Sequence, residues 1–172
     1  MNTQLEENTT NAQKETFVKI IVDAWDAQNK KVDKLLDTIS EEHWKAETAP
    51  GANRGIYLLG HLTAVNDALL PLLGFGEKLY PRLEEIFLTS PDKSDFELPS
   101  VDELKSYWNE INAKLAIHFS EISPDEWFGR HTSVSDEDFA KEPHRNKLNV
   151  LVSRTNHQSY HLGQISLLAK KA

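Results

Sequence analysis

The sequence predicts an all-α protein, built as a four-helix bundle with long connections between helices two and three and between helices three and four. Three observations support this fold class. Long segments carry apolar residues at steps of three and four, the period of an amphipathic helix. N-cap signatures and Pro or Gly breaks separate these segments. No stretch shows the period-two alternation of a β-strand convincingly.

The composition is typical of a soluble globular protein with one domain. The chain has 172 residues, of which 39% are hydrophobic and 27% charged. Its net charge is −8 and it has no cluster of Lys and Arg, so we expect neither nucleic acids nor anionic membranes as partners. It has no Cys, which excludes disulfides and zinc–thiolate sites. With no signal-peptide pattern and no run approaching the ~18 apolar residues of a membrane span, we expect a cytoplasmic protein.

The first helix is expected over residues 12–39. Residues 1–12 are polar and are predicted to form a flexible N-terminus, followed by a single domain over residues 13–172. The predicted core stripe of the helix places Trp25 to one side. The stripe consists of Phe17, Ile21, Ala24, Gln28, Val32, Leu35 and Ile39.

A short helical turn, with His43 on its surface, and a Pro-Gly break lead to the second helix, expected over residues 53–73. His61 lies within or beside the apolar face of this helix. A less regular segment follows over residues 77–99, with a short helix around residues 80–87. A connection of this length often covers a pocket.

A capping box at Ser100 and Glu103 begins the third helix, in which His118 is expected at a helix interface. A second cap at Ser123 begins a short helix that ends at Trp127, as residues 40–44 end at Trp44. This echo predicts a loosely repeated helical hairpin. A polar stretch over residues 129–146, with both of its histidines exposed, then leads to the fourth helix over residues 147–169.

Three histidines are candidate metal ligands. His157 and His161 are four residues apart in the fourth helix, so their rings lie on one face. If the helix that carries His61 packs against this face, three neutral imidazoles can converge on one cation and leave coordination positions open. Imidazole is a common ligand for zinc and also suits nickel and iron. The spacing alone also fits one packed and one solvent-facing histidine.

Two segments together resemble the DinB-like (DinB/YfiT-related) superfamily of four-helix bundles. They are Leu58-Leu59-Gly60-His61-Leu62 and Asn156-His157-Gln158-Ser159-Tyr160-His161-Leu162-Gly163-Gln164. The segment from Trp44 to Asn53 is similar to the family's link before its second helix. The resemblance covers roughly residues 13–170. It implies that His61, His157 and His161 bind one divalent ion, and that the chain forms a homodimer, for which Trp25 off the core stripe is additional support.

The resemblance further implies a metal-dependent enzyme that activates a thiol or a water, of the thiol S-transferase or hydrolase type, acting on a small-molecule substrate. Zinc and nickel are the expected metals, and a low-molecular-weight thiol is a candidate cosubstrate. No thiol-binding motif can be assigned. The candidate residues around the metal are Tyr57, Asn156, Tyr160 and Gln164. The alternative is a non-catalytic dimeric helical module that binds a metal or a small molecule.

Overall fold

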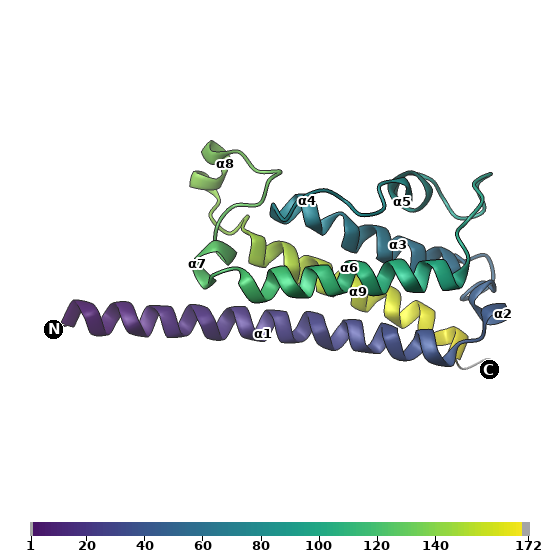
Figure 1. Cartoon of the computed structure of the whole chain (residues 1–172), viewed down its shortest axis with the longest axis horizontal. Helices are drawn as coiled ribbons and strands as arrows, with labels where there is room; N and C mark the ends of the chain where they lie inside the picture. Colours follow the sequence, from purple (N-terminus) through teal and green to yellow (C-terminus); the bar gives the residue numbers. More distant parts are fainter. Residues whose placement is uncertain (1, 170–172) are drawn as a thin grey trace.

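The computed structural model describes residues 2–169, with side chains from residue 11 onward. These residues form an all-α structure without β-strands, as predicted, and contain only two isolated β-bridges. Four long helical segments run side by side, with α1 along α9 and α3 against both α6 and α9 (Figure 1). They are α1 (Asn2–Thr38), α3 (Gly55–Asp67) with its continuation α4 (Leu69–Leu73), α6 (Val101–Glu121) and α9 (Lys147–Ala169).

Helix α1 differs from its prediction in its start and in its buried face. It begins at Asn2 and not at residue 12, while flexibility of residues 1–12 stays a prediction. Phe17 is 60% exposed, whereas Trp25 is only 3% exposed. The expectation that Trp25 lies off the core is therefore wrong. Its indole packs edge-on against Phe119 of α6, at 6.4 Å between ring centroids, and a large aromatic ring contributes more apolar burial than Ala24 would.

Two short helices, α2 (Glu41–Trp44) and α7 (Pro124–Trp127), follow the same plan. The hydroxyls of Ser40 and Ser123 accept hydrogen bonds from backbone amides of the first turn, which satisfies donors that have no partner within the helix. Each helix ends at a fully buried Trp. An isolated bridge after each one, Glu47 with Arg54 and Arg130 with Asn146, leads into the next long helix. The repeated link seen in the sequence is thus present in the structure.

The two long connections are partly helical. Between α4 and α6 lie α5 (Arg82–Glu84) and the π-helical turn η1 (Glu85–Thr89), close to the short helix expected there. Between α7 and α9 lies α8 (Asp136–Lys141), which was not predicted because four of its six residues are charged and it shows no apolar stripe. His144 in this connection is exposed as expected. His131 is half-buried, which corrects the expectation that it is exposed.

The segment α3–α4 is the apolar centre of the fold. Residues Gly55–Leu73 are long and apolar enough to span a membrane by length and composition, with a mean hydropathy of 1.4, which corrects the expectation that no run approaches this limit. However, 78% of that window is buried within the protein. Packing against α6, α9 and η1 accounts for this apolar composition.

A buried layer of amides joins the four long segments. Gln158 of α9 donates to Asn29 of α1 at 2.8 Å, and Asn66 of α3 donates to Asn112 of α6 at 3.0 Å. Asn29 lies 3.4 Å from Asn112, which closes the row. Because buried amides must find partners, this layer favours one register of the helices.

Candidate metal centre

The structure brings His61, His157 and His161 together, although they come from two helices. The Nε2 atom of His157 lies 3.2 Å from Nε2 of His61 and 3.1 Å from Nε2 of His161. One candidate ligand atom from each ring lies within 4.8 Å of the others, and all three side chains are half-buried. The i, i+4 spacing on α9 and the contact of α3 with α9 produce this arrangement.

Hydrogen bonds on the far side of two rings determine which nitrogen faces the cluster with a lone pair. Nδ1 of His61 lies 2.8 Å from the carbonyl oxygen of Phe87, and Nδ1 of His161 lies 2.7 Å from Oε1 of Gln164. Both oxygens can only accept, so both Nδ1 atoms carry the proton and donate. When such a ring is neutral, its Nε2 atom carries the lone pair that metal ligation requires.

The third ring, His157, is held in a neutral state by its surroundings. Burial, followed by nearby His161, His61 and Arg154, lowers the pKa of His157 to about 4. Burial also lowers the pKa of His161. No carboxylate contributes to either change. Three imidazoles with converging Nε2 atoms form, in their neutral state, a donor set that fits a divalent transition metal such as zinc or nickel.

The π-helical turn that orients His61 is anchored to the same face of α3. Tyr57 donates its hydroxyl to the carbonyl oxygen of Ser90 at 2.7 Å. The guanidinium of Arg54 binds Asp92 at 2.6 and 2.9 Å, and the Arg54 amide binds it at 2.7 Å. Burial alone would raise the pKa of Asp92, but these hydrogen bonds lower it below its ordinary value. Arg54, Tyr57 and His61 thus hold the segment at three points along one face.

Gly60 allows this segment to approach α3 closely. A Cβ atom at position 60 would lie 2.3 Å from the ring of Phe87, closer than real Cβ contacts come. The missing side chain gives the Phe87 ring its place in the core and brings the Phe87 carbonyl beside His61.

The residues predicted to surround the metal occupy different positions. Gln164 contacts His161 directly. Tyr57 is buried and stacks on His61, but its hydroxyl is bonded to Ser90 and not directed to solvent. Tyr160 is 66% exposed and touches His161 only edge-on, at 5.1 Å between centroids, and Asn156 is exposed.

Two features near the histidines were not identified from the sequence. The carbonyl of Phe87 is a backbone group, so the type of residue at position 87 does not indicate that it contacts His61. Arg154 lies on the same row of α9 as His157 and His161, a periodicity that the sequence does contain, although it suggested no role there.

A separate cavity lies under the long connection between α4 and α6. Its volume is about 450 Å³, and it is lined by Tyr80, Leu83 and Leu98 of the connection and Tyr107 of α6. None of the three histidines lines it. The connection therefore covers a pocket, as its length predicted, but this pocket is distinct from the histidine cluster.

Comparison with known proteins identifies the family. The family model described as DinB family matches residues 10–172. The crystal structure of a conserved protein from Enterococcus faecalis has the same fold, with a TM-score of 0.61 at 16% sequence identity, over 88% of this chain and 94% of that one. No curated protein matches. The match of the family model over nearly the whole sequence shows that this chain belongs to the DinB family.

Proposed function

We propose that this protein is a metal-dependent enzyme in which His61, His157 and His161 hold one divalent ion, zinc or nickel. The convergence of three Nε2 atoms, two of them oriented by acceptors behind the ring, is the observation that carries the proposal. Membership of the DinB family supports a metal-binding helical protein. A structural role for the ion is less well supported, because the apolar cores around Trp44 and Trp127 account for the packing of the helices.

The chain's residues suit a site that leaves coordination positions open to a small-molecule substrate. An ion with three protein ligands lowers the pKa of a bound water or thiol and so supplies a nucleophile near neutral pH. The rings are half-buried, and Gln164 and Phe87 keep His161 and His61 in the ligating tautomer. Because the chain has no Cys, a thiol reaction would need a low-molecular-weight thiol as cosubstrate. The reaction class is therefore hydrolysis or thiol S-transfer.

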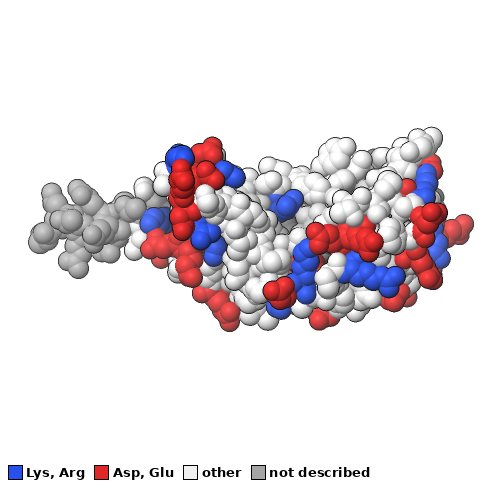
Figure 2. All heavy atoms as spheres, turned by 90° about the horizontal axis from the view of Figure 1, so that it is seen from above, with Lys and Arg blue, Asp and Glu red and all other residues white. Residues whose placement is uncertain are grey.

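We also propose the finer architecture and the setting of this activity. The architecture is a four-helix bundle in which α3 and α4 act as one helix. Phe17 and Ile20 are 60% and 55% exposed on one side of α1, which supports a homodimer through that helix. Trp25, which was expected to support the dimer, is buried and does not. Figure 2 shows acidic and basic side chains intermixed on the face in view, which supports a small-molecule substrate over nucleic acid and a cytoplasmic location over a membrane surface.

Metal analysis of the purified protein with two matched histidine variants tests the metal centre. His157→Ala removes the central ligand, whereas His144→Ala removes an exposed histidine outside the cluster. We expect one zinc or nickel per chain in the wild type and in His144→Ala, and a large loss in His157→Ala. A wild type that cannot be loaded with either metal contradicts the proposal.

A second measurement tests catalysis. Metal-loaded and metal-stripped protein are assayed with ester and amide substrates, and with electrophiles in the presence of low-molecular-weight thiols. We expect turnover that disappears on stripping and returns on reloading. Stoichiometric metal without turnover in either assay favours the non-catalytic metal-binding module.

A further inference from the structure

Arg154 is a half-buried cation beside the histidine cluster and has no partner among the described side chains. It lies on α9, three residues before His157, so Arg154, His157 and His161 occupy one face of the helix. Its guanidinium makes no hydrogen bond or ion pair with any residue that the structure describes. By contrast, the guanidinium of Arg54 binds Asp92, that of Arg130 binds Asp136 and that of Arg145 binds Glu142.

Its position is not explained by stability. Removing a guanidinium from water without a partner costs free energy. Burial lowers the pKa of Arg154, but an arginine stays charged at neutral pH. Residues that lower the stability of the folded state, with no hydrogen bond or ion pair to offset the cost, are expected at functional sites.

The electrostatics of the cluster indicate what the arginine binds. The charge of Arg154 reaches the cluster, because it helps to lower the pKa of His157. No carboxylate of the described residues is among the groups that shift the pKa of His157 or His161. Three neutral imidazoles leave the full charge of a divalent ion uncompensated, and Arg154 adds one more positive charge. Such a concentration of positive charge attracts an anion to the open side of the site.

We propose that Arg154 binds an anionic group, a carboxylate or a phosphate, of the small molecule that occupies the histidine site. The planar guanidinium presents paired N–H donors that match two oxygens of either group. A substrate held in this way has its reacting end directed to the face of α9 that carries His157 and His161. This inference rests on the proposed function, because it assigns the substrate class of that same site.

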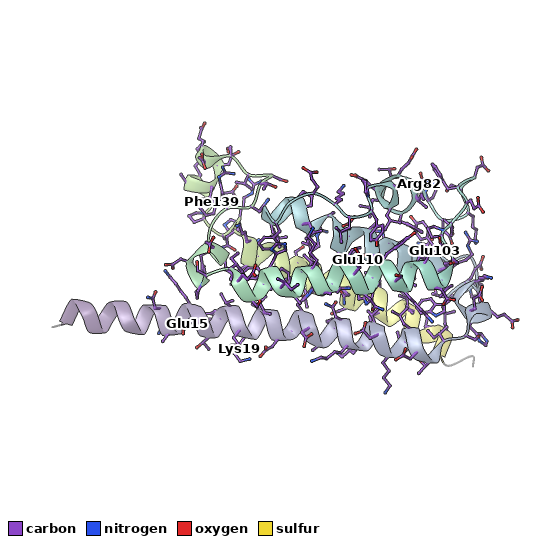
Figure 3. The ribbon with its side chains drawn as sticks, in the orientation of Figure 1. Glu15, Lys19, Arg82, Glu103, Glu110 and Phe139 are labelled. Carbon is purple, nitrogen blue, oxygen red and sulfur yellow. The ribbon has the colours of Figure 1, made fainter. Side chains whose placement is uncertain are left out.

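The test uses simple probes and charge-matched variants. Acetate, inorganic phosphate and neutral acetamide are titrated into zinc-loaded and into metal-stripped protein, and amide chemical shifts report binding. The variants are Arg154→Gln, Arg154→Lys and the control Arg82→Gln. Arg82 is an exposed arginine on α5 that likewise lacks an ion pair among the described residues (Figure 3). Circular dichroism confirms that each variant is folded.

We expect Arg154→Gln to weaken binding of at least one anion about tenfold or more, as loss of a charged hydrogen-bond partner does. The anion affinity of Arg154→Lys should fall between those of wild type and Arg154→Gln, because lysine keeps the positive charge but lacks the paired N–H donors of the guanidinium. Arg82→Gln should bind the anions as tightly as the wild type does. Binding of acetamide should be the same in all variants. The stronger of the acetate and phosphate effects identifies the group.

Two outcomes overturn the inference: anions that bind Arg154→Gln as well as wild type, or an equal loss in Arg82→Gln. Failure of the proposed function is seen separately, as no uptake of either zinc or nickel. In that case the metal-stripped titration decides, since binding that depends on Arg154 supports the anion site and binding that does not depend on it overturns the site. If Arg154→Gln does not fold, the comparison of Arg154→Lys with wild type decides.

Discussion

Nδ1 of His61 lies 2.8 Å from the carbonyl oxygen of Phe87, a residue 26 positions further along the chain. This contact joins the connection after α4 to the helix that carries the candidate ligand. It also determines the tautomer of His61, because the carbonyl oxygen can only accept a hydrogen bond, so Nδ1 of the ring carries the proton. On α9, Gln164 does the same for His161 through its side chain. The two acceptors differ in kind but direct two Nε2 lone pairs to the same point.

Replacing Gln164 is expected to weaken metal binding without unfolding the protein. Gln164→Leu removes the acceptor of the His161 Nδ1 proton, and loss of such a partner costs about 10–100-fold in metal affinity. Gln164→Glu keeps an acceptor oxygen and should retain most of the affinity. Zinc dissociation constants from a competing chelator measure both. Equal affinities in wild type and Gln164→Leu would show that His161 needs no such orientation.

Zinc should stabilise the protein more at pH 7.5 than at pH 4. Ligation needs neutral imidazoles, and burial lowers the pKa of His157 to about 4 and that of His161 below its ordinary value, so protons compete with the ion only toward the acid end of this range. Zinc-dependent stability is therefore present at high pH and is lost as the pH falls to about 4. Thermal unfolding with and without zinc measures the difference. A rise in melting temperature that is equal at both pH values contradicts ligation by these histidines.

The metal-free protein should lose stability between about pH 6.5 and pH 4 in part because of His157. In this window the unfolded chain protonates His157, whereas the folded chain, with a pKa of about 4, does not. The unfolded state binds more protons, so stability falls with the pH. His157→Gln should reduce the slope of melting temperature against pH, and His144→Gln, on an exposed connection, should not. Identical slopes in all three proteins refute the assignment.

A methyl group at position 60 should destabilise the fold, whereas the same change at position 163 should not. Gly60→Ala places a Cβ 2.3 Å from the Phe87 ring, and overpacking of this kind costs about 1–3 kcal/mol. Gly163, on the exposed side of α9, has nothing within 4 Å of its built Cβ. Gly163→Ala should therefore stabilise by up to about 1 kcal/mol through helix propensity. Urea unfolding measures both, and a neutral Gly60→Ala would show that η1 can move away without loss.

The exposed apolar side of α1 should mediate self-association. Figure 3 labels Glu15 and Lys19, charged residues on the same helix that flank Phe17 in the sequence. Phe17→Glu should shift a dimer toward monomer, because a charge in an apolar interface is costly. Ile117→Glu, at a 58% exposed position on α6, is the control. Light scattering at micromolar concentration gives the masses, and a wild type that is strictly monomeric contradicts the dimer.

Local features of the sequence predicted most of the long helices and the histidine pair. Apolar periodicity and caps predicted the bounds of α9 and the start of α6 at Ser100, since both depend on local residues. The i, i+4 spacing of His157 and His161 requires only helical geometry. Local sequence did not predict which side of α1 is buried. Ala24 and Trp25 are neighbours on the helix, and it is the contact with Phe119 of α6 that buries Trp25.

The completion of the site depends on the packing of helices that are far apart in the sequence. His61 is 96 residues from His157, so their 3.2 Å approach depends on the packing of α3 against α9. The Phe87 carbonyl is a backbone group whose direction follows from η1 and its anchors on α3. Arg154 has no partner among the side chains that the structure describes, and this too follows from packing, because residues far apart in the sequence can form ion pairs.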